Sequence, residues 1–439
     1  MADVKNEPKV PFDIAQDDWK SWSLAVDGDV ATLSMNVPET GGLRPGYELK
    51  LNSYDLGVDI ELYDAVQRVS FEHPQVKAVV VTSGLDRVFC SGANIYMLGS
   101  SSHPFKVNFC KFTNETRCSL EEPEMPTFIA AVNGPCAGGG YELAMACKDI
   151  LLIDDGSSAV SLPEVPLLAV LPGTGGLTRL VDKRRVRRDI ADIFCTKAEG
   201  FKARDAVKGR LVDAVFTRSK WTDGVAAWAR DAADAYTGPS GDTGIAWPRI
   251  GTDFEFLTLE KDPDGRTATL TIAGPSSPPP ADFVAAGAEA WSIKAFRELE
   301  RCFFELRFNE QELGLLLVKT TGDQNTMLAW DDALLAAAEA GNWLAIRTLA
   351  FQRRTLCRFD NMSRSLFALV EENSNFAGTL QELALAADRT YMFLDDDGEN
   401  AVRLGPTNGG TFPMANGSTR LANRFYGEPE KVGELLGME

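Results

Sequence analysis

The stretch Ala131-Val132-Asn133-Gly134-Pro135-Cys136-Ala137-Gly138-Gly139-Gly140-Tyr141-Glu142-Leu143-Ala144 joins a short apolar run to three consecutive glycines. A backbone without side chains can approach a ligand closely. Where such a backbone opens a helix, its free N–H groups can hold an oxygen that becomes negative during a reaction. Glu142 lies three residues beyond Gly139, close enough to serve as a general acid or base. The stretch therefore predicts an active site made of backbone amides and a carboxylate.

A second carboxylate, Glu164, lies in an apolar segment further along the chain. The neighbours that suggest shielding from water are Leu162, Val165, Leu167 and Leu168. Two carboxylates in an apolar pocket repel each other and lose hydration, which separates their pKa values and keeps one protonated. The structural alternatives are a first-turn helix glutamate for Glu142 and a solvated loop residue for Glu164. We predict an acid–base pair.

Composition excludes several classes of partner. The chain has 439 residues, 44% hydrophobic and 24% charged, which is typical of a soluble globular protein. At this length we expect about two or three domains. The formal net charge is −19, so no basic face is available for nucleic acid or for an anionic membrane surface.

The compartment is predicted from the N-terminal segment and the cysteines. Residues 1–20 are polar and have no apolar core, so we expect no secretory signal, and no apolar run is long enough to span a membrane. The eight cysteines form no CxxC pair and no zinc spacing. With only two histidines, a histidine metal site or a Ser-His-Asp triad is not expected. These features predict a cytoplasmic protein without a metal.

The first half of the chain alternates strands with helical patterns. Strands are expected at residues 31–35, 76–81, 128–132 and 150–153, and a helix at residues 60–71. This alternation predicts an α/β layered fold with right-handed crossovers. A turn-rich stretch then predicts a linker at residues 236–257, between a first domain at 1–235 and a second at 258–439.

The second domain repeats the first at a spacing of about 240 residues. The recurring pairs of segments are 31–34 with 268–271, 79–84 with 317–322, 137–144 with 377–384, and 178–180 with 419–421. Four matches in the same order predict duplication of one fold.

The second copy is altered where the chemistry should be. Gly139-Gly140 becomes Thr379-Leu380, and the segment that matches Glu164, residues 405–408, contains no carboxylate. Glu382 matches Glu142 but lacks these partners, so we expect it to be structural. The copy stops soon after Leu421 and is either naturally short or truncated. We therefore expect a degenerate second domain and one active centre in the chain.

Three segments resemble the enoyl-CoA hydratase/isomerase (crotonase) superfamily. They are Phe89-Cys90-Ser91-Gly92-Ala93-Asn94, the stretch from Asn133 to Glu142, and Pro163-Glu164 followed by residues 171–180. The resemblance implies a crotonase-like ββα spiral, here duplicated in tandem. It also implies an acyl-CoA substrate, with no cofactor beyond the CoA that belongs to that substrate. Because members of the superfamily form oligomers, we expect a homodimer.

The resemblance also assigns roles to individual residues. It implies that the N–H groups of Ala93 and Gly139 form an oxyanion hole and that Glu142 and Glu164 are the catalytic acid and base. It further implies substrate-binding positions at Gly92, Asn94, Gly138, Gly140 and Lys50. For Lys50 a contact with a CoA phosphate stands beside the alternative of a solvated surface lysine. Cys90 and Cys136 are expected to line the pocket.

The tandem layout resembles those superfamily members that open the ring of 2,3-epoxybenzoyl-CoA by hydrolysis, with loss of formate. We expect this activity. An ordinary hydratase or isomerase acting on another acyl-CoA would use the same two glutamates, and a non-catalytic scaffold could retain the fold. These alternatives stay open at the level of the sequence.

Overall fold

The computed structural model describes residues 9–394 and 400–438. The first eight residues of the segment in which no secretory signal is expected lie outside the described residues. The chain forms two compact units, Ile14–Gly244 and Lys9–Asp13 with Ile245–Glu439. Among the described residues, none of the helices combines the length and the apolar character needed to cross a bilayer.

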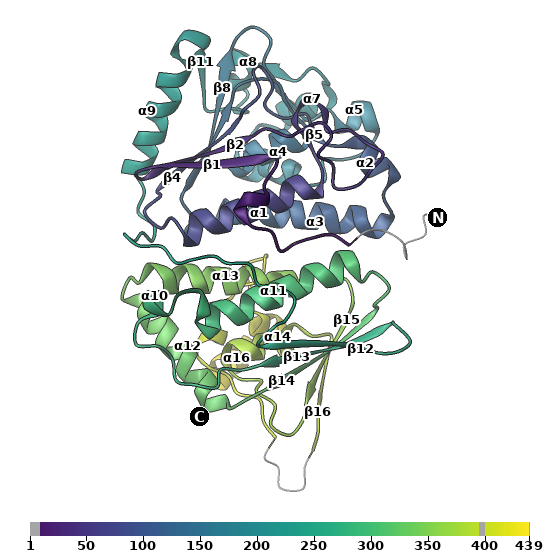
Figure 1. Ribbon diagram of the computed structural model, residues 1–439, viewed down its shortest axis with the longest axis vertical. Helices are drawn as coiled ribbons and strands as arrows, with labels where there is room; N and C mark the ends of the chain where they lie inside the picture. Colours follow the sequence, from purple (N-terminus) through teal and green to yellow (C-terminus); the bar gives the residue numbers. More distant parts are fainter. Residues whose placement is uncertain (1–8, 395–399, 439) are drawn as a thin grey trace. The chain divides into compact units, whose positions relative to one another are not determined.

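The first unit is built on a six-stranded sheet in the order β1-β2-β4-β6-β8-β11 (Figure 1). Its strands are β1 (Trp22–Asp27), β2 (Val30–Met35), β4 (Ala78–Ser83), β6 (Thr127–Val132), β8 (Asp149–Asp154) and β11 (Ala214–Thr217). β1 and β2 form an antiparallel hairpin, and the other neighbours are parallel. Because crossover helices cover both faces of a parallel sheet, its central strands are apolar on both sides, as at Val79 and Val80.

Helices connect and cover these strands. They are α1 (Leu56–Phe71), α2 (Ile95–Ser100), α3 (His103–Ser119), α4 (Gly139–Ala146), α5 (Glu164–Leu168), α6 (Gly176–Thr178), α7 (Arg188–Thr196), α8 (Ala203–Lys208) and α9 (Trp221–Asp234). Asp55 caps α1 by accepting the N–H groups of Gly57 and Val58, which satisfies donors that have no partner within the helix. On one face of the sheet, Ala229 and Ala233 of α9 pack in a cluster with strand residues such as Ile129.

Short strands bring together residues 89–94, here called the first glycine segment, and residues 133–142, the second glycine segment. β3 (Ser53–Tyr54) pairs in parallel with β5 (Gly92–Ala93). β7 (Cys136–Ala137) pairs with β9 (Ala159–Ser161), which pairs with β10 (Phe201–Lys202). A single bridge between Cys90 and Cys136 links these two small sheets. The first glycine segment is thereby fixed next to the second.

The second unit has the same strand order as the first five strands of the first unit. Its sheet runs β12 (Leu257–Lys261), β13 (Thr267–Ala273), β14 (Leu315–Thr321), β15 (Ser365–Val370) and β16 (Arg389–Met392). β12 and β13 are antiparallel, and the remaining pairs are parallel. Its helices include α11 (Trp291–Asn309), α12 (Gln324–Glu339), α13 (Trp343–Asp360), α14 (Gln381–Ala386) and α15 (Arg420–Arg424).

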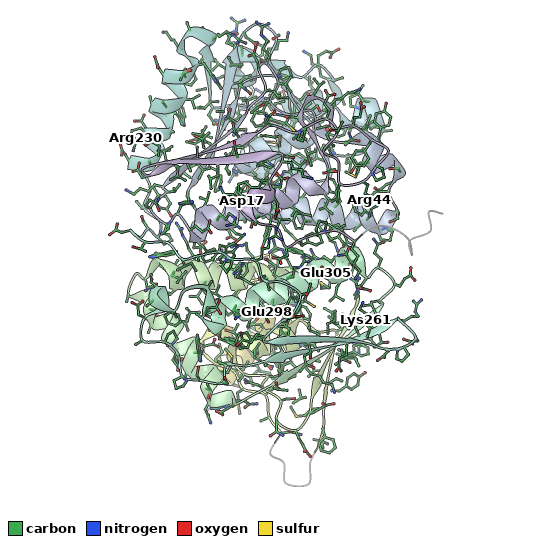
Figure 2. All side chains as sticks on the ribbon, viewed as in Figure 1. Asp17, Arg44, Arg230, Lys261, Glu298 and Glu305 are labelled. Carbon is green, nitrogen blue, oxygen red and sulfur yellow. The ribbon has the colours of Figure 1, made fainter. Side chains whose placement is uncertain are left out.

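In both units, a glutamate of the first long helix accepts backbone N–H groups at the start of the first strand. In the first unit, Glu61 of α1 accepts the N–H groups of residues 20–22 at 2.8 to 3.1 Å. In the second unit, Glu298 of α11, which is labelled in Figure 2, accepts those of Glu255 and Phe256 at 3.0 and 2.8 Å. The repeated topology and the repeated anchor agree with the recurring sequence motifs. Duplication as the origin of the chain stays a prediction.

Residues 9–13 lie in the second unit, although the sequence placed them in the first domain. Val10 exchanges hydrogen bonds with the amide of Asn309 at 2.8 and 3.1 Å. Phe12 packs on Phe304 and Phe308, with ring centroids 5.1 and 5.2 Å apart. These contacts join segments about 300 residues apart, so no local pattern could have predicted them.

Candidate active site

The two glycine segments predicted to bind substrate lie against each other. Gly92 has φ +91°, and a Cβ atom there would lie 2.9 Å from both the Ala137 oxygen and the Gly139 nitrogen. Only glycine fits, because a side chain would be strained and would push the segments apart. Gly140 is also closely packed, since a Cβ atom there would lie 2.7 Å from Cβ of Cys90. The glycines therefore set the distance between the two segments.

The backbone directs the amides of Ala93 and Gly139. Ala93 is in register with Tyr54, and the Asn94 N–H donates to the Tyr54 oxygen at 2.8 Å. Since successive N–H groups of a strand point in opposite directions, the Ala93 N–H points away from β3. Gly139 is the first residue of α4, where an N–H has no partner within the helix. This arrangement is compatible with the predicted oxyanion hole.

Tyr54 and Arg117 support this part of the site, and neither was identified from the sequence. A Cβ atom on Gly139 would lie 2.0 Å from the Tyr54 hydroxyl oxygen, so this hydroxyl packs directly on the glycine. Arg117 of α3 is 1% exposed, and its Nη2 donates to Tyr54 Oη and to the Gly139 oxygen, both at 3.0 Å. The available signal was an arginine on the buried face of α3, at helical spacing from Phe109 and Thr113.

Glu142 is held by a glycine-containing loop. The carboxyl group is 2% exposed, and its Oε1 accepts the N–H groups of Thr174 and Gly176 at 2.9 and 2.8 Å. The Thr174 hydroxyl bonds to Oε2 at 2.6 Å. A Cβ atom on Gly176 would lie 2.7 Å from Glu142 Cγ, so this position also requires glycine. The loop therefore fixes the orientation of the first carboxylate.

Glu164 lies next to Gly138 of the second glycine segment. Its Oε1 would be 2.8 Å from a Cβ atom on Gly138, which has φ +54°. Its Oε2 is buried and accepts no hydrogen bond from any described residue. Burial raises the pKa of Glu164 to about 7, and the nearby charge of Glu142 acts in the same direction. A carboxyl group with this pKa can gain or lose a proton near neutral pH.

The apolar neighbours of Glu164 do not provide this burial. Leu162 is fully buried, but Val165, Leu167 and Leu168 are 37%, 66% and 42% exposed. The expectation that all four shield Glu164 was therefore wrong for three of them. α5 has only five residues, and its side chains beyond Glu164 face outward. The Glu164 carboxyl group lies against Gly138 through its Oε1, and its Oε2 is buried.

Two predicted substrate-binding residues have other contacts. The Asn94 side chain caps α2 by accepting the N–H groups of Tyr96 and Met97, and its amide donates to the Glu48 oxygen at 2.7 Å. Its side chain is thus used within the protein. The Lys50 side chain is 64% exposed and pairs with Glu48 at 2.7 Å, so a phosphate contact there stays a prediction.

The cysteines close to the site are buried thiols. Burial raises the pKa of Cys90 to about 12, and its Sγ donates to the Asn52 oxygen at 3.0 Å. Burial also raises the pKa of Cys136. A thiol with a raised pKa is a poor nucleophile. The described part of the chain has no group of three or more histidine, cysteine, aspartate or glutamate side chains arranged to hold a metal ion.

In the second unit, the glutamate that matches Glu142 is neutralised. Glu382 is 2% exposed and accepts from Arg420 at 2.9 Å and from Asn408 at 2.7 Å. Arg179, which matches Arg420, instead donates to the Thr174 oxygen at 2.9 Å. The loop that carries Thr174 thus takes the place of this ion pair in the first unit. Glu382 has a structural role, whereas Glu142 has no such pair with Arg179.

Comparison with known proteins places the chain in a family. The enoyl-CoA hydratase/isomerase family model matches residues 48–237. The benzoyl-CoA-dihydrodiol lyase of Aromatoleum evansii is 50% identical over 451 residues, which covers 99% of this chain and 81% of that protein. The chain belongs to the enoyl-CoA hydratase/isomerase family. The expected crotonase fold is thereby confirmed.

More distant relatives match about half of the chain. The fatty acid oxidation complex subunit alpha of Idiomarina loihiensis is 35% identical over 46% of this chain and 27% of its own length. A crystal structure of enoyl-CoA hydratase from Bacillus anthracis is 25% identical, with a TM-score of 0.41 over 49% of this chain and 77% of that chain. The glycine segments and both glutamates lie within the matched residues 48–237.

Proposed function

We propose that the first unit catalyses the hydrolytic ring opening of 2,3-epoxybenzoyl-CoA. Two waters are consumed, and the products are formate and 3,4-didehydroadipyl-CoA semialdehyde. The proposal is supported by the 50% identity with the Aromatoleum evansii lyase over nearly the whole chain. The geometric observation that carries it is the carboxyl group of Glu164, whose Oε1 lies against Gly138 and whose buried Oε2 has no donor among the described residues.

The backbone amides of Ala93 and Gly139 would bind the thioester oxygen. Cleavage of the ring bond beside the thioester-bearing carbon leaves electron density on that carbon, and the thioester carbonyl accepts it as an enolate. Fixed N–H groups stabilise this developing charge without reorganising, and the loss of one such donor costs about 3 kcal/mol in barrier height. Tyr54 and Arg117 hold Gly139 in place for this task.

The two glutamates would divide the proton transfers. Glu164 has a pKa of about 7, so it can donate a proton to the departing epoxide oxygen at neutral pH. Glu142, which already accepts two backbone N–H groups on Oε1, would activate the attacking water as a base. The sequence did not indicate which glutamate is the acid and which is the base, so this division of roles is an addition to the sequence prediction.

The remaining parts of the proposal concern the ligand and the assembly. CoA belongs to the substrate, and water is the only co-substrate in the reaction as written, so we propose no separate cofactor. The exposed Lys50, whose backbone oxygen accepts the Ser91 hydroxyl at 3.3 Å, would meet a CoA phosphate. We also propose a homodimer located in the cytoplasm.

The test compares two substrates. The purified protein is incubated with enzymatically prepared 2,3-epoxybenzoyl-CoA and separately with crotonyl-CoA, and formate and acyl-CoA products are quantified. We expect stoichiometric formate from the first substrate and slow hydration of the second. Rapid hydration of crotonyl-CoA without formate release would instead identify a hydratase. Unchanged turnover in both Glu142→Gln and Glu164→Gln would contradict the assignment of these residues as acid and base, whereas no turnover of either substrate by the wild-type protein would favour a non-catalytic scaffold.

A further inference from the structure

The second unit keeps the backbone turn of the predicted oxyanion hole. Gly378 has φ +51° and matches Gly138, which has φ +54°. The next residue, Thr379, takes the place of Gly139. The N–H of Thr379 therefore has the same position in the turn as the N–H of Gly139, which we expect to bind the thioester oxygen.

A carboxyl group of the protein itself accepts the hydrogen bond of this N–H group. Asp331 of α12 is 3% exposed, and its Oδ2 accepts the Thr379 N–H at 2.7 Å and the Thr407 hydroxyl at 3.0 Å. Its Oδ1 accepts the Thr379 hydroxyl at 2.6 Å. A Cβ atom on Gly378 would lie 2.1 Å from Oδ2, so the carboxyl group fills the space above this glycine.

The partners of Asp331 come from the segments that match the first active site. Thr379 stands at the position of Gly139, and Thr407 lies in the segment that matches Glu164. In the part of the chain that the structure describes, no arginine or lysine forms an ion pair with Asp331, whereas the nearby Glu382 and Asp360 both pair with Arg420. Burial raises the pKa of Asp331 to about 7. A buried carboxyl group that has hydrogen bonds but no ion pair is costly when ionised, so its position needs a specific reason.

We propose that the second unit retains an anion-binding site built on the Thr379 amide and that Asp331 closes it as an internal ligand. The carboxylate oxygen accepts the N–H of the residue that matches Gly139, whose N–H we expect to bind the thioester oxygen in the first unit. A substrate oxygen is excluded from the second unit because the amide is already taken. The site would accept a small carboxylate once the Asp331 side chain is removed. The proposal rests on the proposed function only for the comparison with Gly139.

Carboxylate rescue of Asp331→Ala tests this site. The variant leaves the Thr379 N–H and the Thr407 hydroxyl without an acceptor, so we expect a lower Tm for the full-length protein. Acetate or formate on the order of 100 mM should restore at least half of the lost Tm, because a ligand that binds only the folded state stabilises it. Neither sodium chloride at equal ionic strength nor acetamide should do so. The wild-type Tm should not respond to acetate beyond the sodium chloride control.

Two further variants separate a built site from a general salt effect. Asp323 caps the same helix through the N–H groups of Asn325 and Thr326 but is exposed. Asp323→Ala should lower Tm without any rescue by acetate, since it opens no buried site. In Asp331→Ala/Thr407→Val one donor is missing, so half-maximal rescue should require several-fold more acetate.

The outcomes that overturn the proposal are distinct from a failure of the proposed function. An Asp331→Ala variant that acetate does not stabilise more than sodium chloride does would refute the anion site, whatever substrate the first unit takes. If the variant does not fold in plain buffer, refolding yields with and without acetate are compared by circular dichroism. An acetate-dependent yield supports the site, and failure under both conditions refutes it.

Discussion

Replacing Gly139 with alanine tests the support of the predicted oxyanion hole. The new Cβ atom would lie 2.0 Å from the Tyr54 hydroxyl oxygen, about 1.4 Å closer than ordinary contact at 3.4 Å. Either the ring or the first turn of α4 must move by about 1 Å, which also disturbs the two hydrogen bonds of Arg117. A displacement of this size can cost about 100-fold in rate.

We expect Gly139→Ala to lower kcat by about 100- to 1000-fold, as for the loss of one oxyanion donor. Overpacking should also lower the free energy of unfolding by about 1–3 kcal/mol. The assay is steady-state formate release with denaturant unfolding in parallel. Gly99→Ala is the matched control, because this glycine of α2 has nothing within 4 Å of its Cβ position. A Gly139→Ala enzyme that keeps more than one third of the wild-type kcat would refute the reasoning.

Two further predictions concern charge. The pKa of Glu164 rises on folding from 4.5 to about 7, so its carboxyl group binds protons more tightly in the folded state, and its contribution to stability is lost as pH rises from about 4.5 to 7. In urea unfolding, Glu164→Gln should remove up to about 3 kcal/mol of the pH dependence of the free energy of unfolding. The same variant should lose the transition in kcat/KM near pH 7. A pH profile of kcat/KM that matches the wild type would contradict the role of Glu164 as the acid. Arg117→Met removes a buried cation with two hydrogen bonds and should lower the free energy of unfolding by about 3 kcal/mol. Arg187→Met, which removes an exposed guanidinium, should change it by less than about 1 kcal/mol, and equal losses in the two variants would contradict the buried role of Arg117.

Local sequence patterns were sufficient to predict the layered fold and the position of Glu142. The β-branched run at residues 76–81 became the central strand β4, and the glycine triplet became the start of α4. Such features depend on residues close together in the chain, because strand burial and helix initiation are set by short-range spacing. The altered triplet at Thr379-Leu380 is also a local feature, and the prediction of a degenerate second copy depends on it.

The surroundings of the carboxylates were decided by tertiary packing. Sequence neighbours suggested an apolar shield for Glu164, whereas the structure buries its carboxyl group against Gly138. Asn94 was expected to contact substrate, but its side chain caps α2. In both cases the decisive partner is a backbone group whose position depends on how separate segments pack. Neighbouring residue types carry no information about that partner.

The sequence alone was enough to identify residues with the chemistry for a crotonase-like site, namely two glycine segments and two glutamates, whereas the degenerate second copy stays a prediction. Only the tertiary structure decided how these groups are held. Arg117 reaches Tyr54 and Gly139 from another helix, and Asp331 reaches Thr379 across 48 positions of the chain. The physical reason is that a buried polar group must find its hydrogen-bond partners wherever the fold places them. Those partners are fixed when the elements pack and not by local spacing.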